Sequence, residues 1–544
     1  MGTGCRLSDL MSRRSEYLVK QNITWRFNFC RTILGGCMSG LVVGFGRTDS
    51  LKIEEMFDKI RYRGPYLSGI SVNNRAIMAQ NYLKADCPEA HPENDPVPVT
   101  NPGNKNSFIC YDGQMGNSND LCNTHGITDG PFKEERLILH LFKKYGPDML
   151  SYLDDAVFAF VISDGENLFA ARDLLGIKTL FYGYKDGTLY LTSELKSLIT
   201  ITDEVYEFPP GHYMNGSGTL TRFAELPQSQ PKILADDLDK ITATIRDIIQ
   251  RSFNNRVDFN VLTGSLLSGG IDSSVIVWLA SEAYMNKFGN NACLKTFALG
   301  VGESEDIKCA RLMAAHINSD HHELIVDLDR ILEILPGVIY YLESFDPSLV
   351  RGSVSNYLIS RYAKEKRIEV LLSGEGGDEI FCGYLYLKDF PAEELFARQM
   401  ECIGFLHNNA SLRLDRMNLC NSVRVVAPLI SGELLNYAMA LPPEYKQRPE
   451  GDQKIEKWIF RKAFENVLPK EIVWRLKQEF SQGSGSADIL PAYFEETIKD
   501  EALLEAQKSF PMVRSKEELY YFQIFTRHFG SGRAVETVGQ WVCL

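Results

Sequence analysis

The sequence lacks several features that mark other classes of protein. Its 12 cysteines include no Cys-x-x-Cys pair and no repeated spacing, which argues against a zinc site and a disulfide framework. We therefore expect reduced thiols and a cytoplasmic location. No uninterrupted apolar run reaches membrane-spanning length. A net charge of −13 also lacks the positive surplus of a general nucleic-acid surface, so we expect neither a membrane nor a nucleic acid as partner.

The composition is that of a folded enzyme with two or three domains: 544 residues, 44% hydrophobic and 24% charged. Residues 1–37 are basic and irregular, and we treat them as an extension of unknown role. Arg31 and the lack of a continuous apolar segment argue against a signal peptide there. Met38 is an alternative start of translation.

Residues 38–225 form the first predicted domain. Short apolar runs broken by Gly, Asn and Asp predict strands at 39–45, 108–111, 156–162, 180–182 and 189–191. A helical pattern occupies residues 134–145. We expect a β-rich α+β domain.

Residues 226–236 are polar and proline-bearing, which predicts a linker to a second domain at 237–544. There, a helical pattern at 237–253 precedes apolar runs near 261–267, 294–299 and 369–373, with helical segments between them. This alternation predicts an α/β domain with a parallel sheet, followed by a mostly helical C-terminal part.

The most informative segment is Leu266-Leu-Ser-Gly-Gly-Ile-Asp-Ser-Ser274, which joins a strand end to a helix start. Free backbone N–H groups at a helix N-terminus favour an anion, and Gly269 and Gly270 allow a close backbone approach. Ser268 and Ser273 add hydroxyl donors, and Asp272 offers an oxygen ligand for Mg²⁺. The segment is not a Walker A loop. It resembles the pyrophosphate loop of ATP pyrophosphatases, which adenylate a substrate and release pyrophosphate.

A second turn of the same kind follows the apolar run 368–372. Ser373-Gly-Glu-Gly-Gly-Asp378 places two carboxylates among three glycines. Two carboxylates from separate loops that converge on one Mg²⁺ would neutralise charge on the leaving pyrophosphate. The alternative is an acidic, glycine-rich turn in solvent.

From Met38 onward the chain resembles the asparagine synthetase family, which includes the β-lactam synthetases. Besides the two turns, the resemblance rests on Ala171-Arg-Asp-Leu-Leu-Gly-Ile-Lys178, Ser193-Glu-Leu-Lys-Ser-Leu198, Asp320-His-His-Glu323 and Trp474-Arg-Leu-Lys477. It implies an N-terminal Ntn-type αββα amidotransferase sandwich and an ATP-pyrophosphatase synthetase domain. It also implies ATP and Mg²⁺ as cofactors and a small amino-acid-like substrate, and it leaves a homodimer open.

The resemblance also suggests site residues in the second domain. Asp272 and Asp378 would hold Mg²⁺, Ser373 and Gly374 would line the nucleotide, and Leu266 would lie at the adenine edge. By the same resemblance, three further residues receive roles: Lys477 stabilises negative charge at the transition state, Glu375 orients or deprotonates the amine, and Arg351 binds the substrate carboxylate. For Arg351 a structural ion pair is an equal alternative.

The first domain departs from the pattern of glutamine-dependent members. Ser39 stands in place of the N-terminal nucleophilic cysteine, and Tyr82 in place of the arginine that clamps the glutamine carboxylate. Asp112 replaces an asparagine, and an ionised Asp112 would repel the oxyanion. Cys37 is out of register. We therefore expect this domain to be a scaffold without glutaminase activity.

These features predict an ATP-dependent, AMP-forming carbon–nitrogen ligase that adenylates a carboxylate and takes its amine from a source other than glutamine. We slightly favour β-lactam-synthetase-like ring closure in a specialised pathway, such as antibiotic biosynthesis, because proximity makes an intramolecular amine effective. The first alternative is an asparagine synthetase that makes asparagine from aspartate and ammonia, or from aspartate and glutamine. The second is a catalytically silent nucleotide-binding regulatory protein, against which the intact Asp272, Asp378 and Lys477 argue.

Overall fold

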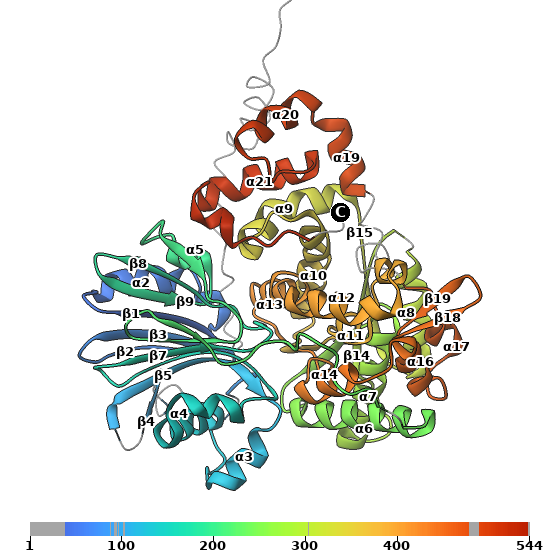
Figure 1. The fold of residues 1–544 in the computed structure, drawn as a ribbon, viewed down its shortest axis with the longest axis horizontal. Coiled ribbons are helices and arrows are strands. Elements are labelled where there is room, and N and C mark those ends of the chain that lie inside the picture. The colour runs from blue at the N-terminus through green and yellow to red at the C-terminus, as the bar shows by residue number, and fades with distance from the viewer. Residues whose placement is uncertain are drawn as a thin grey trace, which may run out of the picture. The chain divides into compact units, whose positions relative to one another are not determined.

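A computed structural model describes residues 39–541, except residues 88, 92–94, 96, 102–103, 235, 303 and 478–488 (Figure 1). The expected extension 1–37, with Cys37, and the alternative start Met38 lie outside the described residues.

The N-terminal part contains two six-stranded antiparallel sheets. The first has the order β10 (Val205–Glu207), β8 (Phe181–Lys185), β9 (Thr188–Thr192), β1 (Gly40–Phe45), β3 (Ala76–Tyr82), β2 (Leu67–Val72). The second has the order β12 (Leu220–Arg222), β11 (His212–Asn215), β7 (Leu168–Arg172), β6 (Ala156–Ser163), β5 (Asn104–Met115), β4 (Val99–Asn101). The helical segments here are α2 (Ser50–Asp58), η1 (Arg61–Arg63), α3 (Ser118–His125), α4 (Lys133–Tyr145), η2 (Gly146–Tyr152) and α5 (Leu195–Leu198).

Strand alternation explains why these sheets stack with helices outside them. Leu41 and Val43 of β1 share one buried cluster with Val161 of the other sheet. Val42, between them in sequence, points the other way and packs in the cluster that holds Ile53 of α2. Helix α4 packs in the same way on the outer face of the second sheet (Figure 1). The predicted αββα sandwich is confirmed.

The second part is built on a five-stranded sheet in which every neighbouring pair is parallel. Its order is β15 (Asp320–Val326), β14 (Lys295–Val301), β13 (Thr263–Leu266), β16 (Val370–Leu372), β17 (Arg424–Val426). The chain therefore winds outward from β13 in one direction and from β16 in the other. Ligands of such sheets bind beyond the carboxyl ends of the two strands where the order reverses. Both predicted phosphate turns follow these two strands.

Helices cover this sheet and make up the C-terminal part, as the sequence predicts. Those around the sheet are α6 (Leu238–Arg256), α7 (Ile271–Phe288), α8 (Glu305–His316), α9 (Leu328–Leu342), α10 (Pro347–Glu365) and α11 (Gly377–Phe381). Those that follow are η3 (Leu385–Asp389), α12 (Ala392–Gly404), η4 (Leu406–Asn408), α13 (Ala410–Leu419), α14 (Gly432–Met439), α15 (Pro443–Lys446), α16 (Trp458–Phe464), α17 (Lys470–Val473), α19 (Ile489–Thr497), α20 (Asp500–Ser509), α21 (Lys516–Phe529) and η5 (Arg533–Thr537). A small hairpin, β18 (Gln447–Glu450) and β19 (Gln453–Glu456), precedes α16.

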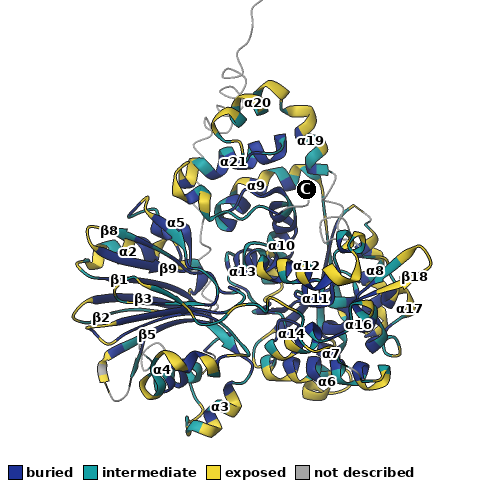
Figure 2. Ribbon diagram, viewed as in Figure 1, coloured by how far each residue is buried: buried dark blue, intermediate teal, exposed yellow. Residues whose placement is uncertain are grey.

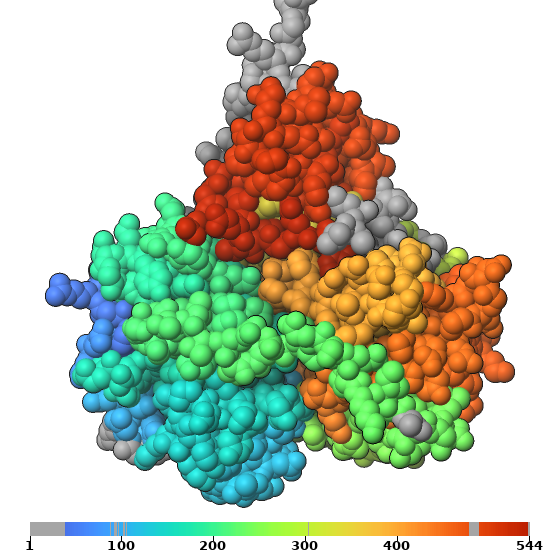
Figure 3. Space-filling model, in the orientation of Figure 1, coloured from blue at the N-terminus to red at the C-terminus, as the bar shows by residue number. Residues whose placement is uncertain are grey.

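The helices turn buried faces inward and exposed faces outward (Figure 2). Within the described residues, no helix is both long and apolar enough to cross a membrane. The segment between β12 and α6 runs over the surface (green in Figure 3), held in part by the backbone hydrogen bond from Leu234 to Ala440.

Candidate functional site

The turn after β13 has the geometry that the sequence predicts for a phosphate-binding loop. Gly269 has φ +70°, and a Cβ there would lie 2.4 Å from Cys309 Cβ, so only glycine fits. The Ser268 and Ser273 hydroxyls lie 3.2 Å apart across the loop. Helix α7 begins directly afterwards with Asp272 in its first turn, so free N–H groups and the positive end of the helix dipole face the loop.

The turn after β16 packs directly against the first one. A Cβ on Gly374 would lie 2.5 Å from Ser273 N, and a Cβ on Gly377 would lie 2.4 Å from Asp272 Oδ1. The two loops can touch only because neither glycine carries a side chain. This contact brings Asp272 and Asp378, 106 positions apart by their numbers (378 − 272), to one site.

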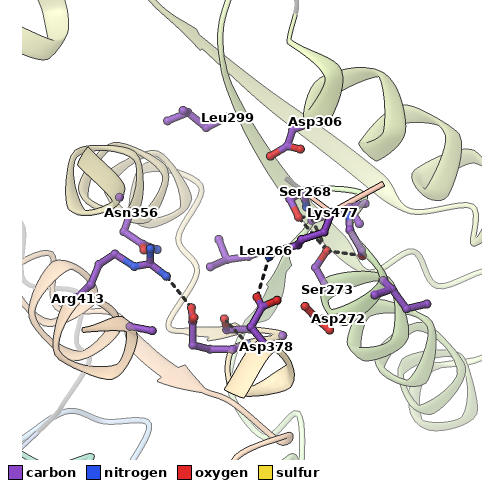
Figure 4. Close-up of a pocket in the computed structure, with 18 of the residues that line it drawn as sticks. Leu266, Ser268, Asp272, Ser273, Leu299, Asp306, Asn356, Asp378, Arg413 and Lys477 are labelled. Carbon is purple, nitrogen blue, oxygen red and sulfur yellow. Dashed lines mark hydrogen bonds and ion pairs between the residues drawn. The ribbon is translucent and has the colours of Figure 1, made fainter. Parts of the chain in front are cut away.

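A cavity of about 190 Å³ opens beside these loops. It brings together all but two of the second-domain residues that the sequence singled out, the exceptions being Gly269, which lies within the first turn, and Arg351. The predicted residues that line it are Leu266, Ser268, Gly270, Asp272, Ser273, Ser373, Gly374, Glu375, Asp378 and Lys477. Figure 4 shows Ser268, Ser273 and Lys477 on one side of it and Arg413 and Asn356 on the other. Phe297 and Leu299 of β14 line it beside Leu266, which gives an apolar patch for a planar base.

Two lysines neutralise the two aspartates. Lys457 Nζ lies 2.5 Å from Asp272 Oδ2 and 2.7 Å from Asp378 Oδ1, so it bridges both carboxylates. Lys477 Nζ lies 2.7 Å from Asp378 Oδ2. The Lys457 side chain is 1% exposed. Two cations at a phosphate loop are suited to a polyanionic ligand.

Burial and the two lysines act in opposite directions on the aspartates. Burial alone would raise the pKa of Asp378, but Lys457 and Lys477 outweigh it and hold that pKa well below its usual range. Burial raises the pKa of Asp272, and Lys457 offsets this only in part. Asp378 is thus ionised at neutral pH.

The two aspartates fit a Mg²⁺ ion that also binds phosphate. Asp272 Oδ1 is buried and has no hydrogen-bond partner among the described residues, which leaves a hard oxygen donor unused. Mg²⁺ is commonly held by one or two carboxylates together with substrate phosphates. The position between the carboxylates also already accommodates a positive group, the Lys457 ammonium.

Arg475 holds the segment that carries Lys477 against the first phosphate turn. Its guanidinium contacts Asp306 Oδ1 at 2.6 Å and the Ser268 carbonyl at 3.1 Å. The predicted motif Trp474-Arg-Leu-Lys477 is therefore tied to the phosphate loop by its arginine, which explains how Lys477 reaches Asp378.

Arg351 is not in the cavity. It lies on α10, and its guanidinium forms an ion pair with Glu517 of α21, with Nε donating to Glu517 Oε1 at 3.0 Å. Glu517 is buried and also accepts a hydrogen bond from Tyr521. Because the tight packing of α10 on α21 engages the guanidinium, the substrate-binding role expected for Arg351 does not fit this geometry. The alternative of a structural ion pair does.

The cavity instead contains Arg413 of α13. Arg413 Nη2 lies 2.8 Å from Glu375 Oε2, and both side chains are largely buried. Sequence reasoning missed Arg413 and Lys457, because neither lies in a glycine-rich turn. The only local signal for Lys457 is a charged residue at the start of the apolar helix α16, whereas for Arg413 the sequence offers none.

Ser39, Tyr82 and Asp112, the positions where the resemblance places altered glutaminase groups, line a second cavity, of about 560 Å³. Ser39 is buried there, and its hydroxyl donates to the Tyr111 carbonyl at 2.6 Å. The Tyr82 hydroxyl donates to Glu135 at 2.9 Å, in the buried place where a clamping arginine was expected. Burial raises the pKa of Glu135 to about 8.

Asp112 in this cavity is held between two cations. Its carboxylate lies 2.8 Å from Arg63 Nη2 and 2.9 Å from Lys178 Nζ. Arg63 also pairs with Glu194 and with Asp415 of α13, so Asp112 belongs to a buried ion-pair network that includes residues of both parts of the chain. Such a carboxylate is an acceptor only and cannot serve as an oxyanion donor.

Comparisons with known proteins agree with this geometry. The family model described as Asparagine synthase matches residues 244–410 and 391–541, and the one described as Glutamine amidotransferase domain matches residues 35–225. The chain is 32% identical to an asparagine synthetase (glutamine-hydrolyzing) of Zea mays over 90% of this chain and 85% of the relative. It is 32% identical to one of Gallus gallus over 78% and 81%, respectively, and 31% identical to one of Triphysaria versicolor over 92% and 88%.

These relatives are named asparagine synthetases, which was the first alternative in the sequence analysis. They give no support to β-lactam-type ring closure or an antibiotic pathway. The matches span both parts of the chain and contain both phosphate turns. The chain belongs to the asparagine synthetase family, with an N-terminal amidotransferase-type domain, and is an ATP-dependent, AMP-forming ligase.

Proposed function

We propose that this enzyme forms asparagine from aspartate, ATP and ammonia, and that it does not use glutamine. The observation that carries the proposal is the cluster of Asp272, Asp378, Lys457 and Lys477 at the reversal point of the parallel sheet. Glu375 and Arg413 face it across the same cavity. One side suits a nucleoside triphosphate, and the other suits an amino acid with carboxylate and amino groups.

In the first step the side-chain carboxylate of aspartate attacks the α-phosphorus of ATP. A bond forms from a carboxylate oxygen to phosphorus, and the bond from that phosphorus to the bridging oxygen breaks, which releases pyrophosphate. Asp272 and Asp378 would hold the Mg²⁺ that neutralises charge on the phosphates. Lys457 and Lys477 stabilise the negative charge that grows on the leaving group, while Ser268 and Ser273 donate hydrogen bonds to it.

In the second step ammonia attacks the acyl carbon, the bond from carbon to the AMP oxygen breaks, and the nitrogen loses a proton. We assign the acceptance of that proton to Glu375, which lies across the cavity from the lysine-paired Asp272 and Asp378 and is paired there with Arg413. The products are asparagine and AMP.

Free ammonia is favoured over glutamine as the nitrogen source by the second cavity. The Ser39 hydroxyl donates to a main-chain carbonyl, Tyr82 donates to Glu135 in place of a clamping arginine, and Asp112, held by Arg63 and Lys178, offers no hydrogen bond to an oxyanion. Each of the three functions that glutamine hydrolysis needs is altered.

The test is pyrophosphate and AMP release by the purified protein with Mg-ATP and aspartate, with either ¹⁵N-ammonium or ¹⁵N-amide glutamine. We expect ¹⁵N-asparagine by mass spectrometry from ammonium, and neither label transfer nor glutamate from glutamine. Glutamate release would overturn the glutaminase part of the proposal. A panel of diamino-dicarboxylic acids serves as a third arm: a cyclised product there with none from aspartate would revive ring closure. No pyrophosphate with any acid would indicate a silent regulatory protein.

A further inference from the structure

We propose that Arg413 binds the α-carboxylate of the amino-acid substrate, and that this binding releases Glu375 to act as the base. The identity of the substrate rests on the proposed function, but the assignment of the carboxylate-binding arginine does not. The inference starts from the exclusion of Arg351, whose guanidinium is engaged by Glu517 outside the cavity.

The fold makes a specific space for Arg413. Its side chain crosses from α13 to α10 at Gly352, where a Cβ would lie 2.5 Å from Arg413 Nη1 and 3.1 Å from its Cδ. An alanine at position 352 would displace the guanidinium. Gly352 is the residue directly after Arg351, so one turn of α10 directs one arginine to α21 and leaves room for another to enter the cavity.

Arg413 lies on the side of the cavity that the phosphate cluster leaves open. In Figure 4 it points inward next to Asn356 of α10, with the phosphate turn and Lys477 on the other side. Lys457 and Lys477, the two lysines of the cavity, are bound to Asp272 and Asp378. A carboxylate that binds beside Arg413 is thus separated from the charges that hold the triphosphate.

Arg413 is engaged by Glu375 in this structure, through the 2.8 Å contact of Nη2 with Oε2. A substrate carboxylate would take the place of the Glu375 carboxylate at the guanidinium of Arg413. The charge in contact with Arg413 would therefore be unchanged. Glu375 would then lose its contact with Arg413 and have a carboxylate oxygen free. It could accept the proton that the attacking nitrogen loses. Base activation would follow substrate binding.

The experiment compares Arg413→Lys, Gly352→Ala and Glu375→Gln with the wild type. Loss of a hydrogen-bonded guanidinium–carboxylate contact corresponds to an increase of about 10- to 100-fold in KM for aspartate. We expect that increase in Arg413→Lys and Gly352→Ala, with KM for ATP unchanged. Arg361→Ala, on an exposed part of the same α10, is the matched arginine control and should leave both constants unchanged.

Glu375→Gln separates the two parts of the inference. It removes the carboxylate that competes for Arg413, so KM for aspartate should stay or fall, while asparagine formation slows and aspartate-dependent pyrophosphate release continues. In this variant the rate of amide formation should no longer rise with pH, because the carboxylate that acts as the base is absent. A rise in KM for aspartate in this variant, or a retained pH profile, would overturn the role of Glu375.

Ligand-induced thermal shifts provide a measurement that needs no turnover. The wild type is titrated with a panel of α-amino dicarboxylic acids in the presence of a non-hydrolysable ATP analogue, and the same panel is applied to Arg413→Lys. If another acid replaces aspartate as the ligand, the proposed function fails but the role of Arg413 stands, provided that Arg413→Lys loses that shift. An equal shift in wild type and Arg413→Lys, or KM for aspartate within twofold of wild type in that variant, would overturn the assignment.

Discussion

Replacement of Lys457 by methionine is the most direct test of the charge cluster. Methionine keeps most of the buried length of the side chain but removes the ammonium that bridges Asp272 and Asp378. Two unit charges about 4 Å apart at an effective dielectric constant of about 20 interact by about 4 kcal/mol. If the ammonium stabilises the leaving pyrophosphate by that amount, its loss should lower the rate of pyrophosphate release by about 10³-fold.

The loss should also change how the protein responds to Mg²⁺ alone. In the wild type the ammonium between the two carboxylates competes with a cation for their oxygens. Lys457→Met removes the ammonium that contacts Asp272 and leaves Lys477 beside Asp378. We therefore expect a lower Tm than wild type without metal, and a larger upward shift of Tm on addition of MgCl₂, because binding to the folded state stabilises it.

Pyrophosphate release measured at saturating ATP and aspartate provides the assay, with thermal unfolding at several Mg²⁺ concentrations. Lys462→Met is the matched control, since Lys462 lies on the adjacent helix α16 and pairs with Glu465 outside the cavity. A rate within threefold of wild type in Lys457→Met, with wild-type folding, would refute the reasoning. Equal Mg²⁺ shifts in both proteins would refute the competition between ammonium and metal.

Three other perturbations have defined outcomes. Gly269→Ala forces a left-handed backbone on alanine and places a Cβ against Cys309. The free energy of unfolding should therefore fall by about 1–3 kcal/mol or more, and pyrophosphate release should be lost. Wild-type values in both assays would contradict the loop geometry. Burial would raise the pKa of Glu194, but Arg416, Lys196 and Arg63 outweigh it and hold that pKa well below its usual range. Its stabilising effect is therefore complete above the unfolded pKa of about 4.3 and is lost progressively as pH falls from there through the lowered folded pKa. In urea unfolding, Glu194→Gln should cost about 3–5 kcal/mol at pH 7 and less at pH 4, whereas an equal loss at both would contradict the ion-pair explanation. Asp112→Asn should lower stability, because Arg63 and Lys178 lose a carboxylate, yet release no glutamate from glutamine; glutamate release would show that Asp112 alone blocks that activity.

Much of the fold follows from local patterns. The continuous apolar run of β1 predicts a strand that is buried on both faces, and the glycine-rich turn after β13 predicts a strand followed by a helix. The sequence also predicted that Asp272 and Asp378 lie together, because each lies within a glycine-rich turn that follows a strand of the parallel sheet. The predicted substrate-binding role of Arg351 does not fit the structure, because the direction of its side chain depends on packing against α21, which begins 165 residues later (516 − 351).

The sequence by itself determined the reaction class, since a phosphate turn needs particular small and acidic residues at consecutive positions, and those can be identified without tertiary information. It also predicted, from Ser39, Tyr82 and Asp112, that the first domain does not hydrolyse glutamine. Only the tertiary structure decided which cations face these turns. Lys457 and Arg413 come from distant segments, and a long charged side chain acquires its partner from packing rather than from its neighbours in the chain.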